Sequence, residues 1–129
     1  AASLKALSQW FKEILGDKVS EVRESTRLVN SPAMILNPDG MMTSSMQRLM
    51  YAMHKDLDSL GRKVLELNPR HNIIKRLSSL RETDPDLARN IAEQVFDNAV
   101  ISAGLVIEPR AMVDRIYKII EQALATREQ

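Results

Sequence analysis

The chain has 129 residues, of which 44% are hydrophobic and 4% aromatic, so one domain with a core of aliphatic and methionine side chains is expected. The formal net charge of +1 excludes a strong overall electrostatic preference for nucleic acid or anionic membrane. The absence of cysteine excludes disulfides, thiol nucleophiles and thiolate metal sites, and no apolar run is long enough to span a membrane.

The amino-terminal part of the chain predicts one helix followed by two strands. Apolar residues recur at helical spacing from residue 4 to residue 15, and Gly16 is a stop signal. The stretch 19–28 is rich in β-branched residues and precedes the turn signal NSP, so we expect a strand there. A second, shorter strand is expected over residues 33–36.

A methionine-rich helix is predicted next, because five of the seven methionines lie between residues 41 and 53. One stripe at helical spacing contains Met42, Met46, Leu49, Met50 and Met53. Loop-like sequence flanks the helix on both sides, which favours an exposed element with an adaptable surface for apolar protein segments. Packing of the same stripe into the chain's own core is the alternative.

The carboxyl-terminal half predicts a third strand and three helices. The strand covers residues 63–67 and ends at Asn68-Pro69. Helices are expected from residue 71 to about 81, from Asp84-Pro85 to 103, and from Pro109 onward. A three-stranded sheet needs helices on one face, so the predicted fold class is α+β, in a single domain over residues 1–129.

The last two predicted helices carry more apolar surface than one small sheet can cover. A second copy of the chain could cover this surface by forming a four-helix dimer bundle, or the surface could pack on the first helix and the sheet of the same chain. The candidate dimer residues are Ile91, Val95, Ala99, Met112, Ile116, Ile119, Ile120 and Leu124.

No catalytic constellation, metal site or cofactor motif is found in the sequence. Two histidines, His54 and His71, lack metal-ligand spacing, and the four glycines form no phosphate-binding loop. Residues 61–81 are mainly basic, which allows an alternative function as a basic α+β nucleic-acid-binding domain. However, that stretch lacks interleaved aromatic residues and any nucleic-acid reader motif, so no nucleic-acid partner is expected.

Three segments resemble the carboxyl-terminal domain of the heat shock protein 90 chaperones. They are residues 21–33 (EVRESTRLVNSPA), residues 65–71 (LELNPRH), and the stretch from Asp97 through Pro109 to Val113. The last of these is most similar to the bacterial HtpG and mitochondrial branch. The resemblance follows the order of the chain over nearly its whole length.

The resemblance implies a constitutive homodimer held by the last two helices. It also implies that the methionine-rich helix contacts unfolded or partly folded client proteins. We expect a segment of a longer chaperone, with ATP and Mg used by domains outside this chain, so this segment itself is not expected to be an enzyme. The chain ends ATREQ rather than in the acidic EEVD tail of cytosolic eukaryotic members, so no tetratricopeptide co-chaperone is expected. The expected location is the bacterial cytoplasm, with the mitochondrial matrix as the alternative.

Overall fold

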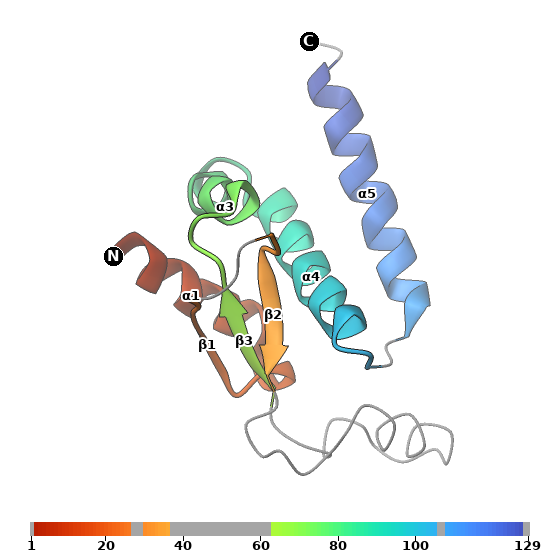
Figure 1. Ribbon diagram of the computed structural model, residues 1–129. Helices are drawn as coiled ribbons and strands as arrows, with labels where there is room; N and C mark the ends of the chain where they lie inside the picture. The colour runs from red at the N-terminus through yellow and green to blue at the C-terminus, as the bar shows by residue number, and fades with distance from the viewer. Residues whose placement is uncertain (1, 27–29, 37–62, 106–107, 128–129) are drawn as a thin grey trace.

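The computed structural model describes residues 2–26, 30–36, 63–105 and 108–127. The elements in these ranges are α1 (Ala2–Leu15), a 3₁₀ turn η1 (Gly16–Lys18), β1 (Glu21–Glu24), β2 (Ala33–Leu36), β3 (Val64–Leu67), α3 (Asn72–Thr83), α4 (Pro85–Ser102) and α5 (Pro109–Arg127). Helices α1 and α4 pack on a small sheet and α3 packs on α4 and α1, whereas α5 lies against α4 and its carboxyl-terminal end stands clear of the other elements (Figure 1). The predicted α+β class and the three strands are confirmed.

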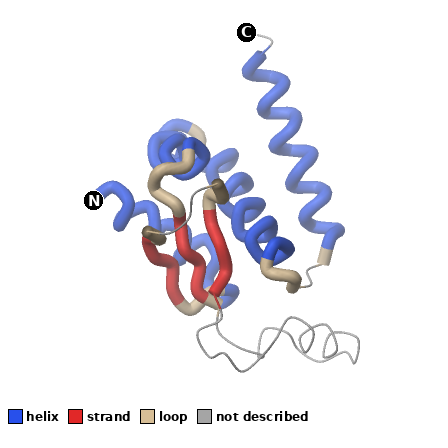
Figure 2. Tube along the Cα trace, in the orientation of Figure 1, coloured by secondary structure: helices blue, strands red, loops and turns tan. Residues whose placement is uncertain are grey.

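The sheet is mixed, with strand order β1-β3-β2. The central strand β3 pairs in parallel with β1 and antiparallel with β2, and all four of its residues are buried. The three strands lie side by side in Figure 2, with helices packed behind them. Strand β1 is shorter than the 19–28 stretch predicted, although backbone bonds from Ser20 to Lys63 (2.8 Å) and from Ser25 to Leu67 (2.9 Å) extend its pairing by one residue at each end.

Local chemistry explains where the helices begin and end. Gly16 adopts a φ of +57°, which ends α1 at the predicted stop, and Gly104 adopts a φ of +82° after α4. The side chain of His71 accepts a hydrogen bond from the amide of Ile73 at 3.1 Å and so caps α3. Asp84 caps α4 in the same way, by accepting from the amide of Leu87 at 3.2 Å.

The core lies between the inner face of the sheet and helices α1, α3 and α4. Phe11, Leu65 and Leu67 are fully buried, and Trp10 packs edge-on against the ring of Phe11 with centroids 5.5 Å apart. This core includes side chains of α4 but does not reach the far side of α5. The apolar side chains on that side of α5 are therefore available to contact other molecules.

Candidate functional site

An apolar stripe runs along the solvent-facing side of α5. It consists of Val113, Tyr117, Ile120 and Leu124, which are spaced i, i+4, i+7 and i+11 and therefore lie along one line of the helix. Tyr117 is 62% exposed and Leu124 is 59% exposed, far more than side chains of a chain's own core. We call this set the α5 stripe.

A largely apolar groove lies beside the stripe, among α3, α4 and α5. Its volume is about 590 Å³. The apolar side chains that line it are Ile73, Leu77, Leu80, Ile91, Val95 and Ile119. Ile119 belongs to the groove and the next residue, Ile120, belongs to the α5 stripe, so the two apolar surfaces adjoin each other around α5. An exposed apolar area of this kind, with charged residues around it, is typical of a protein interaction site.

The structure divides the predicted dimer residues into three groups by exposure. Val95 and Ala99 are buried in the core of the same chain, and Ile120 and Leu124 are exposed on the α5 stripe. The other four are partly buried: Ile91, Met112, Ile116 and Ile119. Because Val95 also lines the groove, its side chain borders the exposed surface despite its burial.

Sequence reasoning did not assign four exposed apolar residues to an interaction surface, and one of them, Ile73 on α3, is 41% exposed and lines the groove. Val113 and Tyr117 complete the α5 stripe, and Ile101 is 48% exposed near the end of α4. The signal for Val113 and Tyr117 was present, because both share the helical spacing of Ile120 and Leu124.

The predicted client-contacting residues lie outside the described residues. These are Met42, Met46, Leu49, Met50 and Met53. Their proposed role therefore depends on sequence pattern and family resemblance.

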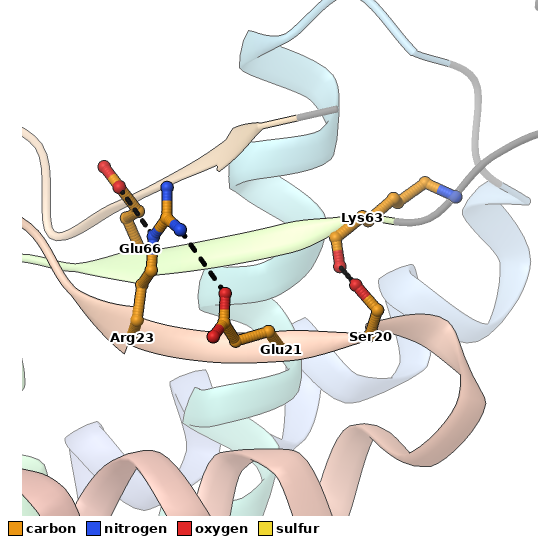
Figure 3. Close-up of polar contacts among 5 residues, drawn as sticks. All are labelled: Ser20, Glu21, Arg23, Lys63 and Glu66. Atoms are coloured by element: carbon orange, nitrogen blue, oxygen red, sulfur yellow. Dashed lines mark hydrogen bonds and ion pairs between the residues drawn. The ribbon is translucent and has the colours of Figure 1, made fainter. Parts of the chain in front are cut away.

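Two ion pairs in the described part of the chain contain a carboxylate that is largely buried. On the sheet, Arg23 Nε donates to Glu66 Oε2 at 3.0 Å, and Arg23 Nη1 donates to Glu21 Oε2 at 3.4 Å (Figure 3). Parallel pairing places Arg23 directly opposite Glu66, so the guanidinium compensates a carboxylate that is only 6% exposed. The second pair, Arg115 and Asp97, joins α5 to α4 at 2.7 Å. Both geometries suit a structural role.

Within the described ranges, no three metal-ligating side chains gather into a group, and none of the described helices is long and apolar enough to cross a membrane. His71, one of the two histidines, caps α3 through its side chain. Among the basic residues of the 61–81 stretch, Arg70, Lys75 and Arg76 are exposed on or next to α3. These observations leave the apolar surfaces as the strongest candidate for function.

Comparison with known proteins identifies the family. The model of the Hsp90 protein family matches residues 1–129. The chain belongs to the Hsp90 family. It is 50% identical over 121 residues to the chaperone protein HtpG of Desulfitobacterium hafniense, which covers 94% of this chain and 19% of that protein.

Other members of the Hsp90 family are also similar to this chain. HtpG of Desulfotalea psychrophila is 44% identical over 128 residues, covering 96% of this chain and 21% of that protein. The bovine mitochondrial heat shock protein 75 kDa is 37% identical over 120 residues, covering 92% of this chain and 17% of that protein. The chain thus spans about a fifth of the length of the bacterial relatives it matches.

Proposed function

We propose that this chain is the carboxyl-terminal dimerisation domain of an Hsp90-family chaperone and that it also contributes a client-contacting surface. The observation that carries the first part is the α5 stripe. Four large apolar side chains at 43–62% exposure, on a helix that projects from the domain, have a physical reason to be covered by another protein surface.

A second copy of the chain is the partner that fits this surface best. In a two-fold dimer the same patch must complement itself, and here a projecting stripe and an apolar groove lie side by side on one protomer. The stripe of each copy can pack on α4 and α5 of its partner, so that the four helices form one bundle. This arrangement agrees with the dimer that the family resemblance implies. It would cover the stripe of each of the two protomers.

Charged residues around the stripe suit the rim of such an interface. Asp114, Lys118 and Glu121 alternate with the stripe along α5 and are exposed. Stable interfaces combine an apolar centre with a polar rim that stays in contact with water. The same rim would keep the separated chain soluble until it meets its partner.

The client-contacting part of the proposal rests on the methionine-rich segment and on the chaperone family. Methionine side chains are flexible and polarizable, so a stripe of them can adapt to apolar segments of many shapes. We propose that unfolded or partly folded proteins bind there. For the whole protein we propose an ATP-dependent chaperone cycle, with ATP and Mg bound by other domains. A bacterial cytoplasmic location is proposed, and a mitochondrial one is the alternative.

The experiment that tests dimerisation is molar mass by light scattering across a dilution series of the 129-residue chain. We expect twice the chain mass of 14.6 kDa at high concentration, with dissociation only on strong dilution. A mass of 14.6 kDa at every concentration would refute the proposed dimer. Binding of a denatured test protein, measured separately, would then decide the client-contact proposal on its own.

A further inference from the structure

A partly buried polar network connects α4 to α5 next to the apolar groove. Arg115 Nη1 donates to Asp97 Oδ2 at 2.7 Å and to Gln94 Oε1 at 3.2 Å. The side chains of Arg115 and Asp97 are only 12% and 13% exposed. Gln94 Nε2 in turn donates to Asn98 Oδ1 at 2.9 Å, so one cation on α5 engages a chain of polar groups on α4.

The apolar contacts between the two helices are less directional than this network. The α5 side chains that are partly buried on the same side are Met112, Ile116 and Ile119. Dispersion and hydrophobic burial depend on area and packing, and a flexible methionine can repack after a small rotation of the helix. The hydrogen bonds of Arg115 depend on direction, so they restrict rotation of α5 about its own axis.

Arg115 and the α5 stripe lie on nearly opposite sides of the helix. At about 100° per residue, the four stripe residues are placed about 140–200° around the axis from Arg115. Fixing the rotation at Arg115 therefore fixes the direction in which the stripe faces. Leu124 lies nine residues further along, about 13.5 Å, so a tilt of about 10° at Arg115 would move it by roughly 2 Å.

We propose that the Arg115–Asp97–Gln94 network is a positioning element that fixes the rotation and tilt of α5 on α4 and so selects one arrangement of the two protomers. This inference rests on the dimer function proposed above. Buried ion pairs often add little stability compared with apolar side chains of similar size, and specifying register is their best-attested role. Removing the network should therefore affect the geometry of the dimer more than the stability of the fold.

The test compares a double variant with single and control variants. Asp97→Leu with Arg115→Met replaces the pair by apolar side chains, whereas Arg115→Met alone leaves the Asp97 carboxylate without its guanidinium. Arg110→Met is the matched control, because Arg110 is on the same helix and its side chain is 94% exposed. Thermal unfolding reports stability, and light scattering across a dilution series reports the dimer dissociation constant.

Helix position is measured with two spin labels in each chain. The sequence contains no cysteine, so Gln9→Cys on α1 and Ala125→Cys on α5 provide specific attachment sites on exposed residues outside the stripe and its rim. Labelled chains are mixed with excess unlabelled chains, so that each dimer contains one labelled chain. Pulsed electron paramagnetic resonance then gives the distance between α1 and α5 within a protomer.

We expect one narrow distance distribution for the parent chain and for Arg110→Met. The double variant should melt at a temperature close to that of the parent chain, yet show a broadened distribution and a dissociation constant raised on the order of tenfold. Arg115→Met alone should also lower the melting temperature. A double variant with a narrow, unchanged distribution and unchanged dissociation would overturn the inference, even if the parent chain is a dimer. A monomeric parent chain would instead refute the proposed dimer and, with it, the selection of a dimer arrangement.

Discussion

Replacing Ile120 by aspartate is the sharpest test of the α5 stripe. Ile120 lies in the middle of the stripe and is 45% exposed in the single chain, so an aspartate there can reach water when the chain is a monomer. In the proposed dimer the same carboxylate would be covered by the partner. Because the dimer is two-fold symmetric, the free-energy cost of burying this carboxylate applies at two positions in every dimer.

The size of the effect follows from burial. Complete burial of an isoleucine side chain contributes about 1.5–3 kcal/mol, and roughly half of that remains to be gained when Ile120 is covered at an interface. Over two copies the lost burial amounts to roughly 1.5–3 kcal/mol. Removing each carboxylate from water adds a cost of several kcal/mol if no cation is near. A loss of at least about 3 kcal/mol corresponds to a dissociation constant more than about 100-fold higher.

The assay is the molar mass across a dilution series, with thermal unfolding measured in parallel. Lys5→Asp is the control, because Lys5 is exposed on α1, away from the stripe and its rim, and its replacement changes the net charge even more. We expect the control to remain dimeric and Ile120→Asp to become monomeric at concentrations where the parent chain is a dimer. An unchanged dimer mass for Ile120→Asp would refute the reasoning. A melting temperature lowered strongly at the monomer level would show that Ile120 belongs to the chain's own core.

The remaining predictions concern the core, a helix cap and the client surface. Leu65→Ala should lower the free energy of unfolding in urea by about 2–5 kcal/mol, because it leaves a cavity at a fully buried position of the central strand, and a loss near zero would contradict that placement. Asp84→Ala should cost about 1 kcal/mol by removing the cap of α4, more than Asp86→Ala in the same helical turn, and equal losses would argue against the cap. Met46→Ser combined with Met50→Ser should weaken the suppression of aggregation of a denatured test protein without changing the melting temperature, whereas a large fall in melting temperature would place the stripe in the core.

The ends of the helices were predictable because their signals are local. Asp84 followed by Pro85 marks the start of α4, and Gly104 supplies the positive φ that follows its end. The order of the strands was not predictable in the same way. Consecutive strands usually lie next to each other, but here β1 and β2 flank β3 on opposite sides. Residues that pair across the sheet lie far apart in the sequence, so no local pattern indicates the pairing.

The interaction surface was only partly predictable, because helical periodicity gives the direction of a side chain but not its partner. Ile91, Val95 and Ala99 follow one helical line on α4, yet Val95 and Ala99 are buried within the chain and Ile91 is only partly buried. The tertiary arrangement decides this difference, because α4 packs on β2 and on the other helices. On α5 the line of Tyr117 and Ile120 stays exposed. Whether these residues form the dimer contact stays a prediction.

The pairing of Arg115 with Asp97 shows why polar residues on amphipathic helices need the structure for their interpretation. In the sequence both residues look like ordinary solvent-facing charges between apolar positions. In the fold both side chains are largely buried, and they meet where α5 crosses α4. The described pairs Arg23–Glu21, Arg23–Glu66, Arg89–Glu93 and Arg110–Glu108 each have at least one more exposed side chain. An apolar surface alone would allow the two protomers to associate in several orientations, because hydrophobic burial depends on the area covered and not on direction. The directional Arg115–Asp97 contact, on the opposite side of α5, would restrict those orientations already in the monomer. The apolar contact area of the proposed dimer would then come from the α5 stripe, and its geometry from Arg115, so substitutions can test the two separately.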